Sequence, residues 1–242
     1  MTSLLPRAAL FAFALAAAPA FANGPITIDA ATFSMENEWA YKADVITSDA
    51  NGVTTIALTD AAMTLKTSTT HYENGDGYNG WFGITLRPGY RMTGFSVSGT
   101  VLGELGPIRT PGGKPGDGFT TNSAKIDLYA SSSATGWSSK QTMQHSMVDG
   151  SIPFVLASGP LSLTGRVGLS MWSPVNVTST PYYPPGPPDG SSGPQVLTLS
   201  SMQILNPTLT IYTSAVPEPE TYGMLLAGIA VIGLVRRRRR LA

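Results

Sequence analysis

Hydrophobic and polar residues alternate along most of the middle of the chain, which is the period of a β-strand with one buried face. Segments 53–59, 82–86 and 92–101 show this alternation, and Asn-Gly, Asp or Pro-Gly pairs beside them are typical of turns. Shorter strands are expected over 63–67, 126–128, 154–156, 161–171 with a break at Gly165, and 197–204 and 209–212, which Asn206-Pro207 separates. The pattern predicts about nine to eleven strands.

The fold class expected from this pattern is all-β, an antiparallel β-sandwich for which a jelly-roll order of strands is one option. A β-helix is the alternative, and the absence of a fixed repeat disfavours it. No window of the mature chain before Tyr222 has a helical period. Two stretches rich in Gly and Pro, 106–118 and 180–194, are typical of surface loops, the second with polyproline II character.

The first 22 residues have the layout of a secretory signal peptide. Arg7 supplies a positive charge, and eleven apolar residues follow from Ala8 to Ala18. Ala20 and Ala22 satisfy the small-x-small rule for signal peptidase, so cleavage after Ala22 is expected. A buried N-terminal helix is the structural alternative, which Pro19 disfavours because proline interrupts helices.

The last 27 residues, 216–242, contain three parts in order. Pro217, Glu218 and Pro219 form a polar, extended strip. Fifteen mostly apolar residues, 221–235, follow and predict a single transmembrane helix of about 22 Å, shorter than a bilayer core of about 30 Å. A basic cluster comes next and should stay cytoplasmic: Arg236, Arg237, Arg238, Arg239 and Arg240.

This tail resembles the PEP-CTERM sorting tail of Gram-negative bacteria, in the proline-glutamate-proline strip, the apolar helix and the arginine cluster. The resemblance implies that an exosortase in the inner membrane recognises residues 217–219 and cleaves near them. The membrane anchor is then transient, and the body reaches the cell surface or the medium. It also implies an association with exopolysaccharide and biofilm. The alternative is a permanent single-span anchor.

The segment between the two ends, 23–215, is long enough for one domain with its own core. It carries nine Lys or Arg against thirteen Asp or Glu, although the whole chain is neutral. An acidic domain without a basic cluster is a poor match for nucleic acid, so none is expected as a partner. The chain has no cysteine, which excludes disulfides, thiolate catalysis and cysteine-bearing metal sites.

The stretch 73–81 is the best local candidate for a metal site. Glu73, Asn74, Asp76 and Asn79 carry oxygen atoms that Ca²⁺ prefers as ligands, although their spacing differs from an EF-hand. The alternative to a metal site is a hairpin connection in which Gly and Asn adopt the left-handed backbone conformation. No other cofactor is expected.

Aromatic residues suggest a second kind of site. Tyr78, Trp81 and Tyr182 are the candidates for a platform on which sugar rings stack, with Asn and Asp side chains nearby to bond hydroxyl groups. Core packing explains Trp81 equally well at this stage, because Trp81 leads into a strand.

Glu36 and Glu38 form the best pair of carboxylates for glycan hydrolysis, since residues two apart share a face of a strand. A solvated strand face explains them better, and we expect no enzyme. The function expected is therefore a non-catalytic, exported surface or matrix protein. A carbohydrate-binding module is the alternative, and an extracellular glycan hydrolase is a third and weaker one.

Overall fold

The computed structural model describes residues 26–37, 44–106, 119–181 and 195–216, with a few single positions outside these ranges. The expected signal peptide with Ala20 and Ala22, most of the two Gly/Pro-rich loops, and the sorting motif 217–219 with the arginine cluster lie outside the described residues. Among the described positions, no helix is long and apolar enough to cross a membrane. The segment expected to do so, 221–235, has only four described positions.

Two six-stranded antiparallel sheets form the domain, which confirms the predicted sandwich. The first sheet has the order β1 (Ile26–Asp29), β2 (Phe33–Asn37), β6 (Tyr72–Leu86), β11 (Arg166–Ser179), β8 (Thr120–Ser132) and β9 (Trp137–Ser146). The second has the order β10 (Gly150–Ala157), β7 (Tyr90–Leu105), β12 (Ser200–Ala215), β4 (Val53–Ala57) and β3 (Val45–Ala50), and β5 (Lys66–Thr69) also pairs with β12.

The alternating pattern places the core between the sheets. On β11 every second residue from Val167 to Val177 is buried, and the residues between them are half-buried or exposed. The largest buried side chains come from both sheets and include Phe33, Phe82, Phe95, Ile84, Leu128 and Leu169. Burial of these apolar surfaces is the main driving force that holds the two sheets together.

One short helix, α1 (Thr59–Thr64), stands where the alternation predicted strand. The strand expected over 63–67 is confirmed only for its last two residues, because Met63 lies in α1 and the strand β5 begins at Lys66. The first N–H groups of a helix lack partners within the helix. Asp44 provides such a partner, since its carboxylate accepts a hydrogen bond from the Thr59 N–H at 3.0 Å. Burial raises the pKa of Asp44, and hydrogen bonds, including one from Asn37, oppose that shift.

Other expectations about local structure need correction. The strands expected from 161 and from 197 begin later, β11 at Arg166 and β12 at Ser200, and before Gly165 only Leu163 forms an isolated bridge, with Met92. Segment 73–81 is not a hairpin connection but the first half of β6, and its residues pair with β11 throughout. Asn206-Pro207 does not separate two strands. Instead β12 is continuous, and its register against β7 shifts between Leu205 and Thr208, as in a β-bulge.

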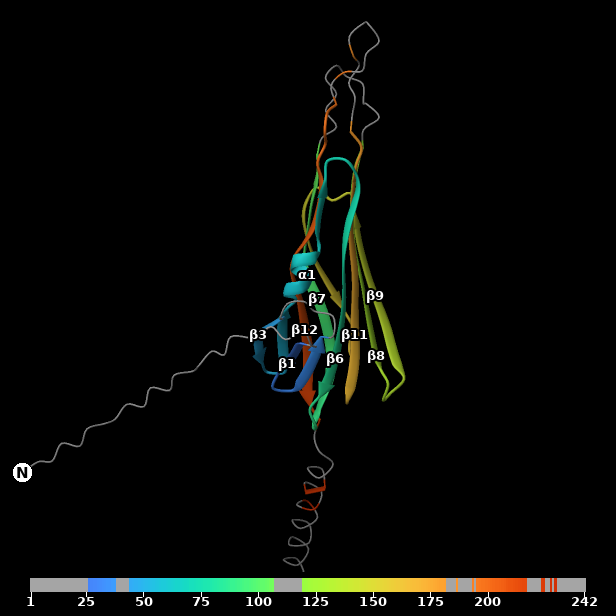
Figure 1. Ribbon diagram of the computed structural model, residues 1–242. Helices are drawn as coiled ribbons and strands as arrows, with labels where there is room; N and C mark the ends of the chain where they lie inside the picture. The colour runs from blue at the N-terminus through green and yellow to red at the C-terminus, as the bar shows by residue number, and fades with distance from the viewer. Residues whose placement is uncertain are drawn as a thin grey trace, which may run out of the picture.

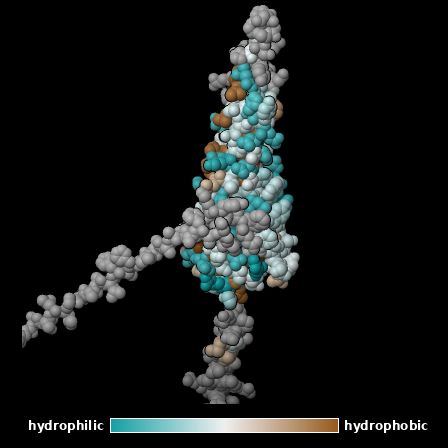
Figure 2. Space-filling model, viewed as in Figure 1, coloured by the Kyte–Doolittle hydropathy of each residue, from teal (hydrophilic) through white to brown (hydrophobic). Residues whose placement is uncertain are grey.

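The hairpin of β8 and β9 forms the outer edge of the first sheet, beside β11 and β6 (Figure 1). β12 is central in the second sheet and ends where the Val216 N–H donates to the carbonyl of Gly89 at 2.8 Å. Figure 2 shows mostly hydrophilic or near-neutral residues on the visible described surface, with hydrophobic residues in small separate patches.

Candidate functional site

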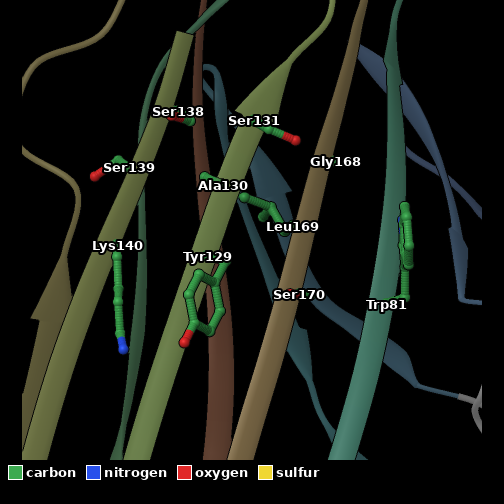
Figure 3. Close-up of a pocket in the computed structure, with 10 residues that line it drawn as sticks. All are labelled: Trp81, Tyr129, Ala130, Ser131, Ser138, Ser139, Lys140, Gly168, Leu169 and Ser170. Atoms are coloured by element: carbon green, nitrogen blue, oxygen red, sulfur yellow. The ribbon is translucent and has the colours of Figure 1, made fainter.

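A row of four residues crosses the outer face of the first sheet. Trp81 on β6 is the register partner of Ser170 on β11, and Ser170 is also the partner of Tyr129 on β8. Tyr129 in turn is the partner of Lys140 on β9. Directly opposed residues on neighbouring strands share one face of a sheet. Figure 3 shows Trp81 and Tyr129 on the two sides of β11, with Lys140 beyond Tyr129.

Strand alternation directs both rings outward. Tyr129 lies between Leu128 and Ala130, which are buried, and Trp81 precedes the buried Phe82. Neighbours on a strand point to opposite faces. Trp81 is accordingly 48% exposed and Tyr129 41% exposed.

A hollow of about 380 Å³ lies over this row and is called the slot below. Its walls are Trp81 and Tyr129, and its floor is Gly168 and Ser170 on the strand between them. It also reaches Ala130, Ser131, Ser138, Ser139, Lys140 and Leu169. Because the floor residues are small, the two aromatic side chains keep an open space between them (Figure 3).

A group of charged residues borders the slot. The Asp127 carboxylate accepts from the Lys125 ammonium at 2.8 Å and from the Thr142 hydroxyl at 2.7 Å, and the Lys140 ammonium lies 3.7 Å away. Desolvation alone would raise the pKa of Asp127, but the hydrogen bonds from Lys125 and Thr142 and the two positive charges lower it overall. Contact with Tyr129, followed by the charge of Asp127, raises the pKa of Lys140. The lowered pKa of Asp127 and the raised pKa of Lys140 both favour the charged forms of these two groups at neutral pH.

Trp172 extends the aromatic surface by one row. It is 46% exposed, pairs with Asp127 and lies 5.2 Å from the Lys125 ammonium, measured to the ring centroid. The Lys140 ammonium is 4.9 Å from the centroid of Tyr129. Sequence reasoning missed Tyr129 and Trp172. The available signal was the alternation itself, since Tyr129 follows Leu128 and Trp172 follows Met171, and both preceding residues were expected to face the core.

Of the three aromatic residues predicted for sugar binding, the structure supports an exposed position for one. Trp81 is a wall of the slot, and Tyr182 lies outside the described residues. Tyr78 is only 2% exposed and belongs to the core, so its predicted role in a surface platform is wrong. It pairs with the buried Ser173, which puts both on the inner face of the sheet. Burial, and then the nearby charge of Asp44, raises the pKa of Tyr78.

The four predicted calcium ligands are divided between the two faces of β6. Asn74 and Asp76 pair with Val177 and Val175, which are buried on the inner face. Glu73 and Asn79 stand at alternate positions to these two on the same strand, so their side chains point to the outer face. The side chains of Asn74 and Asp76 are engaged locally as well: the Asn74 amide donates to the Ser68 carbonyl at 3.1 Å, and the Asp76 carboxylate accepts from the Gly77 N–H at 2.8 Å. Among the described residues, no group of three or more His, Asp or Glu side chains is placed to hold a metal ion.

The predicted carboxylate pair is described only in part. Glu36 forms an ion pair with Arg166 at 3.7 Å, and Glu38 lies outside the described residues. None of the described residues that line the slot is Asp or Glu. The groups that the slot offers to a ligand are therefore aromatic rings, hydroxyl groups and one ammonium group.

Comparison with curated proteins finds no match. Among solved structures, a similar one is TmCBM61 in complex with beta-1,4-galactotriose. It is 11% identical, covers 73% of this chain and 91% of that chain, and has a TM-score of 0.27. A similarity this low carries no argument about function.

The comparison with protein families gives a definite result for the tail. Residues 215–240 match the family described as the PEP-CTERM protein-sorting motif. The match spans the proline-glutamate-proline strip, the apolar segment and the arginine cluster that carried the resemblance in the sequence. The C-terminal tail of this chain therefore belongs to the PEP-CTERM protein-sorting motif family.

Proposed function

We propose that this chain is an exported, non-catalytic surface protein whose β-sandwich binds extracellular polysaccharide at the slot. The PEP-CTERM tail supports export, transient anchoring in the inner membrane and sorting by an exosortase. It does not define the role of the domain in front of it. That role rests on the outer face of the first sheet.

The observation that carries the binding proposal is the open space between Trp81 and Tyr129. Exposed aromatic rings offer flat apolar surfaces that match the apolar faces of sugar rings. The surrounding serines, Ser131, Ser138 and Ser170, supply groups that donate and accept hydrogen bonds with sugar hydroxyls. An aromatic slot with a polar rim on an exported domain fits a polysaccharide that passes across the strands.

The same geometry favours binding without cleavage. Glycoside hydrolysis by the usual mechanisms needs two carboxyl groups on either side of the scissile bond. Asp127, an acidic group that borders the slot, is 2% exposed and held between Lys125 and Thr142, so it is placed for neither proton transfer nor attack. Association with biofilm or matrix follows as the setting in which such binding is useful.

The test is affinity electrophoresis and calorimetry of the full chain in detergent, against a panel of soluble polysaccharides. Trp81→Ala should weaken binding by about tenfold or more, equivalent to about 1.4 kcal/mol. Tyr212→Ala is the matched control, because Tyr212 is an aromatic residue of similar exposure, 40%, on the other sheet. Equal binding by the Trp81 variant and the native chain would refute the proposal, as would no binding to any member of the panel.

A further inference from the structure

The outer face of the first sheet has an excess of positive charge beside the slot. Lys125 and Lys140 share a single carboxylate, that of Asp127, while Arg166 is matched by Glu36. Among these described residues, one positive charge is left over. The domain as a whole has the opposite sign, with nine basic and thirteen acidic residues over 23–215.

We propose that the polysaccharide bound at the slot is acidic, and that Lys140 binds its carboxylate or sulfate groups. This inference rests on the proposed function, because it names the class of sugar that the same site takes. It differs from that function in depending on charge rather than on ring stacking.

The dimensions of the slot suit a single sugar ring. Trp81 and Tyr129 are carried by strands two inter-strand spacings apart, about 9.5 Å. A sugar ring that stacks on an aromatic face lies about 3.5–4.0 Å from it. Figure 3 shows the Tyr129 ring nearly face-on and the Trp81 ring edge-on, so the two rings present their faces in different directions. Gly168 and Ser170 on the strand between them are small, and the hollow of about 380 Å³ over them has room for one sugar ring.

Lys140 is placed at the continuation of the slot past Tyr129. Its side chain is 49% exposed, and its ammonium lies 4.9 Å from the centroid of the Tyr129 ring (Figure 3). Asp127 already accepts short hydrogen bonds from Lys125 and Thr142, and Lys140 stands farther off at 3.7 Å. An ammonium has three donors, so Lys140 retains capacity for an anion on a sugar chain that passes Tyr129.

The acidic residues that the structure describes on this face do not cancel this charge. Glu36 is occupied by Arg166. Glu73 shares the outward parity of Trp81 on β6 but lies eight residues away, which is about 26 Å along a strand. At physiological ionic strength the Debye length is about 8 Å, so Glu73 is screened from the slot. The charges of the described residues around Lys140 therefore favour an anion, although the domain is acidic.

The experiment compares polymers that differ only in charge: polygalacturonate with its fully methyl-esterified form, and dextran sulfate with dextran. The full chain in detergent should bind the acidic member of at least one pair about tenfold or more tightly in low salt, and this preference should shrink as salt is added. Lys140→Met keeps the apolar stem of the side chain and should abolish the preference. Lys66→Met, at an exposed lysine on β5, should leave it intact.

The outcomes separate the two proposals. A preference confined to polygalacturonate identifies a carboxylate, and a preference for both acidic polymers identifies a general anion site. If neutral and acidic forms bind equally and Trp81→Ala weakens both, sugar binding stands and the acidic specificity is overturned. The acidic specificity is also overturned if Lys140→Met keeps the full preference. If Trp81→Ala leaves all binding unchanged, the proposal that polysaccharide binds at the slot is overturned.

Discussion

The hydroxyl group of Thr142 donates to the carboxylate of Asp127 at 2.7 Å, across the hairpin that joins β8 and β9. With the lysines beside it, this contact lowers the pKa of Asp127 below its usual value of 3.8, against the opposing effect of desolvation. A carboxyl group whose pKa is lower in the folded state stabilises the fold above its unfolded pKa and loses that contribution as the pH falls through the folded value. The slot is therefore bordered by a pH-dependent contact.

Asp127→Asn should lower the free energy of unfolding by about 1–2 kcal/mol at pH 7, because it removes charge-assisted hydrogen bonds at a buried position. The melting temperature should fall by about 2–4 °C for each kcal/mol. Thermal unfolding followed by circular dichroism from pH 7 to pH 3 measures the effect. The difference from the native chain should be largest above about pH 5 and shrink below pH 4, whereas Asp149→Asn, at an exposed position, should change little. A difference that grows towards low pH would contradict the assignment.

Gly80 is expected to tolerate no side chain. A Cβ atom there would lie 2.7 Å from ring atoms of Tyr78, which is buried and cannot move aside. Gly80→Ala should destabilise the domain by about 1–3 kcal/mol, the usual cost of overpacking. At Gly77 a Cβ would meet its nearest atom at 3.7 Å, so Gly77→Ala is the matched control on the same strand. Urea denaturation of both variants measures the difference, and equal midpoints would show that the Tyr78 ring is not held in place.

Gly168 offers a way to fill the slot without removing any aromatic residue. A Cβ at this position would lie 3.5 Å from the Ser131 hydroxyl and 3.9 Å from the Trp81 indole nitrogen, both ordinary contacts. Gly168→Ala should therefore keep polysaccharide binding, while Gly168→Leu should abolish it by occupying the floor. Calorimetric binding, with melting temperatures to confirm folding, tests the pair. Native affinity in the leucine variant would mean that the ligand binds elsewhere.

The sorting tail gives a prediction in the native host. Glu218→Ala, or deletion of the arginine cluster 236–240, should leave an unprocessed form in the membrane fraction, since recognition by the exosortase or positioning of the helix is lost. Immunoblots of membrane and medium fractions show the outcome, and intact mass of the native product locates both expected cleavages. Normal release of both variants, or a stable native product that keeps its terminal arginines, would contradict the sorting model.

The alternation of apolar and polar residues was sufficient to predict the sandwich and many of its strands, among them the parts of β6, β7 and β10 that face the core. It failed where a strand has little to bury. The first half of β6, rich in Gly and Asn, resembles a turn locally, yet backbone pairing with β11 holds it extended. β9 alternates between half-buried and exposed positions, so its apolar signal is weak.

The candidate site was predictable only in part. Trp81 was identified from its neighbours in the sequence, but Tyr78, three residues before it, has the opposite parity and is buried. Tyr129 and Ser170 join the same row through pairing between strands far apart in the chain. Which residues face each other across strands depends on which strands become neighbours. The strand order cannot be predicted from the alternation in a single sequence.

The position of β12 has a mechanical consequence. This strand lies in the middle of its sheet, bonded to β7 on one side and to β4 and β5 on the other, and the sorting tail follows it directly. Tension on the tail while it is anchored is therefore transmitted along the central strand and loads both hydrogen-bonded ladders in shear at once. A tail attached to an edge strand would instead peel one ladder bond by bond, so the central position of β12 should make the domain more resistant to force applied through its C-terminal end.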